Sequence, residues 1–409
     1  MLLGGFFVPA WIGWPLALLT AVAMAGAVEA AGVAIALRGF ERKAGADRLR
    51  AAFAARWITQ IHLVLLPFLI AGSLFLGDAP SPSPPSRVGL IAVAFVAFLA
   101  VRFVGVASEG RICREAAGPA ATWRETAMLT VFGALTLPVY VLLAAFVPLQ
   151  WGSPGAAVLV GGLALTVITM YGGWLVPFRR SGAARPASGR LAASVSEVAG
   201  RVGVRPRGVD ELDAPNTNAL ALIVPKRLVF LGPILDVLDD AELAAITAHE
   251  LGHLSEPRGV VRLRVAASLM PVWFIGSSPL AATGPYGVGL LGFNFVALMC
   301  ILLAHAKAAR RMEVRCDAIG REHEGEPGTY ARALAKIYEA NLVPSVNLVK
   351  GTAHPDLYDR LADAGAVPIE PRPQHPKADS RTLLPLAASA ALAAAYVASS
   401  WIIFLRFKR

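Results

Sequence analysis

Charged residues are scarce in this chain of 409 residues. Asp, Glu, Lys and Arg make up 16% of it, whereas 56% is hydrophobic. Average soluble domains are about a quarter charged. The mean hydropathy of +0.58 agrees with this deficit of charge. The composition therefore argues against an ordinary soluble domain and favours an integral membrane protein.

Cysteine is scarce as well. The three cysteines, Cys113, Cys300 and Cys316, have no close spacing. A disulfide framework and a cysteine-rich metal site are therefore not expected. The apolar N-terminal block has no positively charged start and no clear cleavage site, so a removable signal peptide is not expected either.

The charge that is present is mostly basic. The formal net charge is +10 and the pI is near 9.9. A basic balance can indicate nucleic-acid binding. Here the basic residues lie between apolar blocks, as in the cytoplasmic loops of membrane proteins. We therefore expect a lipid bilayer as a partner and no nucleic acid.

Five apolar stretches are long enough for membrane spans, which need about 20 residues. They cover roughly residues 6–37, 57–76, 88–108, 127–148 and 155–177. Basic residues follow the first, third and fifth stretches, and the two remaining loops carry almost no charge. The positive-inside rule then predicts an N-terminal membrane domain, 1–177, whose last span delivers the chain to the cytoplasm.

The next segment, 178–262, has the pattern of a soluble α/β region. "GRLAASVSEVAGRVGV" has helical periodicity, and "RGVDELD", "NALALIV" and "RLVFLG" are strand candidates. "ILDVL" is typical of a short helix. "DDAELAAITAHELGHL" predicts a longer one, in which Asp239 and Glu242 form a capping box.

A second apolar region, 264–305, is interrupted by "GSSPLAATGPYG". We interpret it as a transmembrane hairpin inside a metallopeptidase domain of residues 178–382. A pair of amphipathic or re-entrant helices is the alternative. The segment 383–409 predicts one more span, although the side on which it ends stays open.

The motif His-Glu-x-x-His lies on the capped helix, at His249, Glu250 and His253. Positions i and i+4 share one face of a helix, so the two imidazoles can bind one metal ion. Glu250 can then act as general base toward water at the open position. We therefore expect one Zn²⁺ per chain.

One protein ligand remains to be found. "RRMEVRCDAIG" offers Glu313 and Asp317, four positions apart on a helix face. Glu313 can bind zinc while Asp317 holds a ligand imidazole. A solvated charged helix is the competing interpretation, which the neighbouring arginines would also suit.

Four stretches resemble the integral-membrane zinc metallopeptidases that include HtpX and the type I CAAX prenyl proteases. They are "NAL" at 218–220, the strand and helix leading into the zinc motif, "RRMEVRCDAIG", and "HPDLYDR" at 354–360. The resemblance covers about residues 178–261 and 307–363. Residues 1–177 match only in topology.

The resemblance implies a role for each matching residue. His249, His253 and Glu313 would bind zinc, and Glu250 would be the general base. Asp317 would orient a ligand, and Asn218 would bind the substrate backbone. His354 would stabilise the oxyanion, and Arg360 would support that site. Without the resemblance, His354 would be interpreted as an ordinary loop histidine.

The predicted fold class is a multi-pass α-helical membrane protein with a cytoplasmic α+β zincin-like metallopeptidase domain. The predicted function is a zinc endopeptidase of the inner cell membrane that hydrolyses protein or peptide substrates, in quality control or in processing of peptide tails. Cys316 replaces the family's usual Ala, and "EVRCD" resembles β-lactam sensor peptidases of the antirepressor type. A sensor peptidase that cleaves one regulator is therefore the alternative. The sequence does not determine the oligomeric state.

Overall fold

The computed structural model describes residues 153–214, 216–283, 287–346, 355–366, 372–373 and 391. All but position 391 fall in one compact unit, Glu109–Lys377. The first four predicted spans and nearly all of 383–409 lie outside the described residues. The domain boundaries and the multi-pass topology therefore stay predictions.

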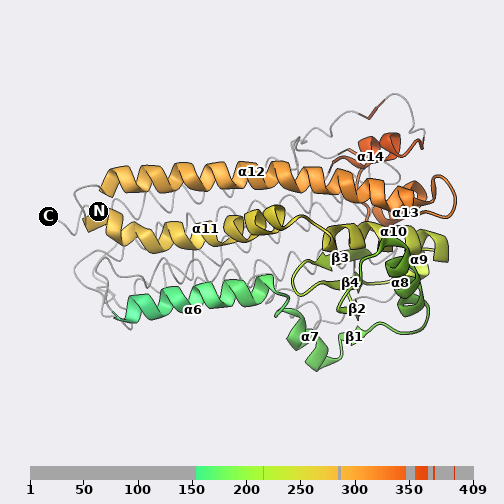
Figure 1. The fold of residues 1–409 in the computed structure, drawn as a ribbon, viewed down its shortest axis with the longest axis horizontal. Coiled ribbons are helices and arrows are strands. Elements are labelled where there is room, and N and C mark those ends of the chain that lie inside the picture. The colour runs from blue at the N-terminus through green and yellow to red at the C-terminus, as the bar shows by residue number, and fades with distance from the viewer. Residues whose placement is uncertain are drawn as a thin grey trace, which may run out of the picture. The chain divides into compact units, whose positions relative to one another are not determined.

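A four-stranded sheet forms one part of this unit (Figure 1). Its order is β1 (Ala184–Pro186), β2 (Gly208–Leu212), β4 (Arg227–Leu231), β3 (Asn218–Leu222). β2 and β4 are parallel, and both outer pairs are antiparallel. The three predicted strands are confirmed. The three-residue β1 was not predicted, because "ARP" has no alternating pattern.

Helix α8 (Gly189–Val202) supplies part of the core. Leu191, Val195 and Val198 are buried and lie on one helical face, as the periodicity predicts. They join buried side chains from β4 and from α10 (Asp240–Leu254), which runs beside α8. The sheet and these helices form the α+β part of the chain.

The start of α10 is the predicted capping box. The Asp239 carboxylate accepts from the backbone N–H of Glu242 at 2.8 Å, and the Glu242 carboxylate accepts from the N–H of Asp239 at 3.0 Å. The short helix α9 (Ile234–Val237) precedes it, as expected. The capping box fixes where α10 begins and thus which of its residues face the interior.

Two long helices, α11 (Arg258–Thr283) and α12 (Gly287–Glu322), run side by side as a hairpin (Figure 1). The helices extend further than expected. α11 continues through "GSSPLAAT", and α12 continues without a break into "RRMEVRCDAIG". Gly, Ser and Pro are poor helix formers in soluble proteins but are tolerated in apolar helices, so their turn signal was misleading here.

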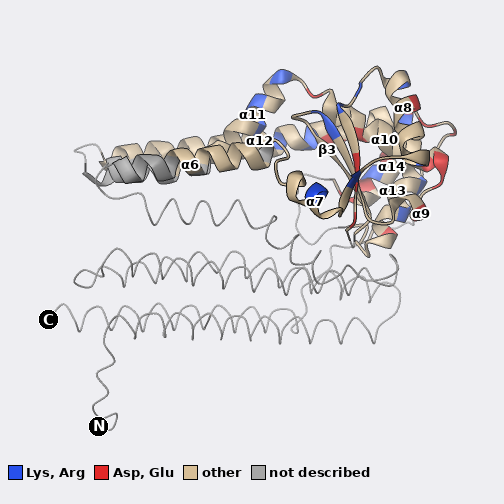
Figure 2. Cartoon of the chain, turned by 90° about the horizontal axis from the view of Figure 1, so that it is seen from below, with Lys and Arg blue, Asp and Glu red and all other residues tan. Residues whose placement is uncertain are grey.

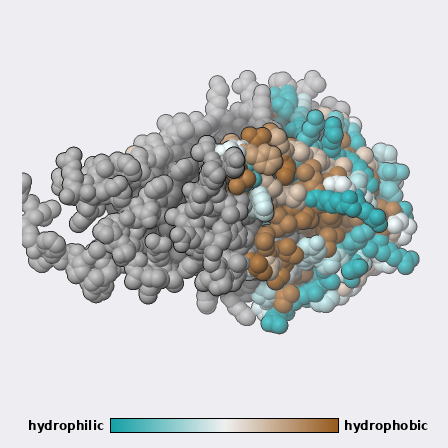
Figure 3. All heavy atoms as spheres, turned by 60° about the vertical axis from the view of Figure 1, so that its left-hand side comes forward, coloured by the Kyte–Doolittle hydropathy of each residue, from teal (hydrophilic) through white to brown (hydrophobic). Residues whose placement is uncertain are grey.

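Within the described residues, the stretch Gly292–Glu322 of α12 is long and apolar enough to cross a membrane. Large hydrophobic side chains of the hairpin are exposed, among them Trp273, Phe293 and Leu303. Figure 3 shows hydrophobic side chains gathered on one face of the described part and bordered by hydrophilic ones.

Helix α6 (Ser153–Met170) packs against α11 and ends before the predicted limit of 177. A turn follows it, and then α7 (Leu175–Ser181). Asp210 of β2 is fully buried and accepts hydrogen bonds from Arg179 of α7 and Arg227 of β4. This ion-paired group attaches α7 to the sheet. Helices α13 (Thr329–Ala340) and α14 (Leu357–Asp363) complete the described fold.

Candidate metal centre

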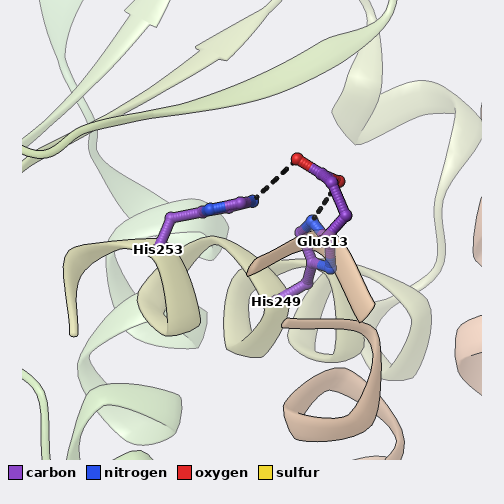
Figure 4. A group of neighbouring side chains, drawn as sticks. All are labelled: His249, His253 and Glu313. Atoms are coloured by element: carbon purple, nitrogen blue, oxygen red, sulfur yellow. Dashed lines mark ion pairs between the residues drawn. The ribbon is translucent and has the colours of Figure 1, made fainter. Parts of the chain in front are cut away.

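The two histidines of the motif lie on consecutive turns of α10 and present their rings to the same side (Figure 4). Their ring centroids are 5.0 Å apart. The exposed fractions of the two side chains are only 8% for His249 and 12% for His253. The interior position of α10 therefore keeps both imidazoles mostly out of water.

Glu313 of α12 points at both rings from the opposite side (Figure 4). One carboxylate oxygen, Oε1, lies 3.5 Å from Nε2 of His253, and Oε2 lies 3.9 Å from Nε2 of His249. One potential ligand atom from each residue can be chosen so that all three lie within 4.8 Å of one another. Ligand atoms about 2.1 Å from a tetrahedral ion are about 3.4 Å apart, so the three residues fit a zinc ion.

Gly252 allows α12 to come this close to α10. A Cβ at this position would lie 3.0 Å from Sγ of Cys316 and 3.3 Å from its Cα. Arg315 then fixes the register of the two helices. It donates to the carbonyl of Gly252 and to Oγ of Ser255 at the end of α10, where a positive charge also suits the helix dipole.

The far nitrogen of the His249 ring has its own partners. Nδ1 lies 3.1 Å from Oδ1 of Asp317 and 2.9 Å from the hydroxyl of Tyr330. That hydroxyl donates to Asp317 at 2.6 Å and accepts from Arg360 at 2.9 Å. With the hydroxyl proton given to Asp317, Nδ1 of His249 acts as the donor. Its Nε2 lone pair then faces Glu313.

Arg360 of α14 holds Asp317 with two hydrogen bonds, at 2.9 and 2.6 Å. Arg360, Asp317 and Tyr330 are all buried. Burial works against the charge of Arg360, but the neighbouring Tyr330 and Asp317 raise its pKa. Burial also raises the pKa of Tyr330 well above its ordinary value, so the phenol stays protonated. Arg360 was predicted to support the oxyanion region, and its contact with Asp317 was not predicted; Tyr330 was missed.

The His253 ring is held in a similar way by residues that the sequence analysis also missed. Its Nδ1 lies 3.0 Å from Oε1 of Glu256, and Arg264 of α11 donates to both oxygens of that carboxylate. Burial opposes protonation of His253, yet hydrogen bonds with Cys316 and Glu256 raise its pKa to about 11. In the metal-free protein this ring is therefore an imidazolium. A metal ion that binds the ring would have to displace a proton from it.

Glu250 follows His249 on the buried side of α10. Burial raises the pKa of its carboxyl, while the two neighbouring histidines lower it. A carboxyl with a raised pKa is a better proton acceptor than a free glutamate. The position and the environment of Glu250 both suit a general base.

Two further predicted site residues are Asn218 and His354. Asn218 is the exposed first residue of β3, which forms an edge of the described sheet and packs against α10. Its side-chain oxygen accepts from the N–H of Ala219. His354 lies outside the described residues, so its role stays a prediction.

Comparison with known proteins agrees with this geometry. Residues 187–367 match peptidase family M48. This segment is a peptidase M48 domain. The M48 domain begins just before α8 and extends beyond α14, so it contains both histidines, Glu313, Asp317 and Arg360. The resemblance stated from the motifs is thereby confirmed.

Curated relatives carry the name "Protease HtpX homolog". One, from Acidiphilium cryptum, is 29% identical over 182 residues, or 41% of this chain and 63% of the relative. A second, "Protease HtpX homolog 2" from Saccharolobus solfataricus, is 35% identical over 130 residues, or 29% of this chain and 39% of the relative. A third, from Methanothermobacter thermautotrophicus, is 28% identical over 36% of this chain and 58% of the relative.

The matched region thus spans less than two thirds of the length of each of these relatives. No solved structure matches the chain. The names of the relatives favour the HtpX branch over the sensor-peptidase alternative. The M48 domain is thus similar to part of the proteases named HtpX homologs.

Proposed function

We propose that this protein is a zinc-dependent endopeptidase that hydrolyses peptide bonds of protein substrates next to a membrane surface. One observation carries the proposal. Two imidazole nitrogens and a carboxylate, from helices far apart in the sequence, lie within 4.8 Å of one another beside a buried glutamate. Three protein ligands and an open position are the arrangement of catalytic zinc sites.

His249, His253 and Glu313 would hold the ion. Bound there, zinc lowers the pKa of water and polarises a carbonyl group, which are the two requirements of peptide hydrolysis. Glu250 takes the proton from the attacking water and returns it to the leaving amine. Asp317 and Tyr330 keep the Nδ1 of His249 as a donor, so that its other nitrogen serves as ligand.

The substrate would lie along β3. This edge strand has an unpaired side within the described sheet, and an extended peptide can add to such an edge through backbone hydrogen bonds. Asn218, exposed at the start of β3, is our candidate for a side-chain contact to the substrate backbone. His354 is proposed to stabilise the oxyanion, and Arg360 to support that region.

The α11–α12 hairpin would cross the bilayer, with the M48 domain on the cytoplasmic side. Exposed apolar side chains cover its middle, and its base carries Arg258, Arg262, Lys307, Arg310 and Arg311, all exposed. Figure 2 shows basic residues at the start of α11, next to the mixed charges of the α/β part. Cytoplasmic ends of membrane helices are typically basic in this way. Labelling of cysteines introduced at position 259 in inverted and right-side-out vesicles tests the orientation.

The two candidate substrate classes are misfolded membrane proteins and peptide tails. The reaction itself is tested with the detergent-purified chain and an unfolded casein in ¹⁸O water. Hydrolysis places one ¹⁸O atom in each new carboxyl terminus, and a zinc chelator stops the cleavage. Cleavage that continues at full rate in the chelator would exclude the proposed function.

A further inference from the structure

Glu256 is a buried carboxylate just beyond the end of the metal-binding helix. Its side chain has an exposed fraction of 0%. Oε1 lies 3.0 Å from Nδ1 of His253, and Arg264 donates to Oε1 at 2.7 Å and to Oε2 at 2.9 Å. Both oxygens are thus used, one of them twice. The partners come from α10 and from the second turn of α11.

This arrangement determines which nitrogen of His253 is available. The guanidinium of Arg264 donates to both oxygens of Glu256, an arrangement that fits an ionised carboxylate, which can only accept hydrogen bonds. The carboxylate therefore stays ionised and accepts the Nδ1 proton. Nε2 faces Oε1 of Glu313 at 3.5 Å. A carboxylate on the far nitrogen of a ligand histidine fixes both tautomer and ring orientation.

The two ligand histidines are supported alike but from different parts of the fold. His249 is held by Asp317, which Arg360 of α14 holds in turn. His253 is held by Glu256, which Arg264 of α11 holds in turn. The first support lies within the α+β part and α12. The second support includes Arg264 of α11. The orientation of His253 therefore depends on where α11 lies.

We propose that Glu256 and Arg264 are positioning residues for His253, and that through them α11 sets the affinity of the centre for its metal. The inference rests on the proposed metal site. It assigns no catalytic step to either residue. A purely structural bond between α10 and α11 would hold the helices together without changing the metal affinity.

Glu242 provides a matched control on the same helix. It is also a buried glutamate with a basic partner, Lys336 at 2.7 Å, but it has no bond to an imidazole within the described part of the chain. Glu242→Gln keeps a residue that still completes a capping box. Both Glu242→Gln and Glu256→Gln remove one buried carboxylate charge, so they share any general effect on stability.

The test is zinc affinity, measured by chelator competition on the full-length chain in detergent, together with the visible spectrum of the Co²⁺ form. We expect Glu256→Gln to weaken zinc binding about 10–100-fold and to alter the Co²⁺ bands. Glu242→Gln should change neither. Arg264→Lys, which keeps the charge but loses the two-point hydrogen bond, should give a smaller loss in the same direction.

The outcomes separate this inference from the proposed function. Wild-type protein that binds no zinc overturns both. Wild-type affinity in Glu256→Gln and in Arg264→Lys overturns the positioning role and leaves the proposed function intact. If Glu256→Gln does not fold, Arg264→Lys alone decides, because a zinc affinity within about twofold of wild type contradicts the role.

Discussion

His253 and Glu313 belong to different helices, yet Nε2 of the first lies 3.5 Å from Oε1 of the second. The hairpin formed by α11 and the apolar part of α12 occupies the sequence between them. Because α12 is one continuous helix, the proposed third ligand is on the same rigid element as the candidate membrane span. Movement of that helix would therefore move a ligand.

Glu313→Ala should abolish stoichiometric zinc binding, because two imidazoles alone leave the ion without its third protein ligand. Zinc per chain is measured on purified protein by atomic absorption. Glu322→Ala removes an exposed glutamate from the same helix and should keep full occupancy. Full zinc occupancy in Glu313→Ala would show that the third ligand lies elsewhere.

Gly252→Ala should separate α10 from α12. The added Cβ would meet Cys316 and Ile319 at 3.0–3.3 Å, and these atoms belong partly to the backbone of α12. We expect a loss of about 1–3 kcal/mol in unfolding free energy, accompanied by weaker zinc binding. The measurement is thermal unfolding with and without zinc.

Gly200→Ala is the control for that substitution. Gly200 is inside α8, and a Cβ there would meet nothing within 4 Å. Since Ala is the better helix former, this variant should be as stable as wild type or more stable. Equal behaviour of the two variants would contradict a tight contact at Gly252.

Tyr330→Phe removes a hydroxyl that contacts Asp317, His249 and Arg360 while keeping the ring. Asp317, His249 and Arg360 each lose one hydrogen-bond partner but keep one another, so we expect a cost of about 1 kcal/mol, and the His249 tautomer loses part of its support. We expect lower stability and lower zinc affinity. Tyr358→Phe, on α14, is the control. The Tyr358 hydroxyl has no hydrogen bond within the described part of the chain, so this variant should leave stability and zinc affinity unchanged.

Zinc affinity should rise with pH. His253 has a pKa raised to about 11 in the metal-free protein, so the ring carries a proton at neutral pH. A group with a raised folded-state pKa contributes stability below its ordinary value of 6.5, and this contribution is lost as the pH rises toward 11.

Zinc must displace that proton. The apparent affinity should therefore increase about tenfold per pH unit when one proton is released. Chelator competition between pH 6.5 and 8.5 measures the slope. An affinity that stays constant over this range would contradict a protonated His253 in the metal-free state.

Local signals predicted much of the fold. The capping box at Asp239 and Glu242 needs only two residues three positions apart, and the three longer strands have clear patterns. Helices α11 and α12 run beyond the predicted hairpin segment, and α11 continues through "GSSPLAAT", whose turn signals an apolar helix overrides. Strand β1 was missed because only its pairing with β2 makes it a strand.

The site residues also fall into those that local sequence signals predict and those that depend on tertiary packing. His249, Glu250 and His253 are adjacent on one helix and form a recognisable motif. Glu256 lies three residues beyond His253, so its spacing could have suggested a contact. Tyr330 and Arg264 gave no such signal, because their contacts depend on how α13 and α11 pack against the metal-binding helix.

The central claim is that Glu250 performs the chemistry at a zinc centre held by other residues. Its most direct test is the cleavage rate of Glu250→Gln, measured on protein whose zinc content equals that of wild type. The amide keeps the size of the side chain but cannot accept the proton of water. We expect one zinc per chain and a rate lower by at least about 100-fold. A zinc-loaded Glu250→Gln enzyme that cleaves casein at the wild-type rate would contradict the account.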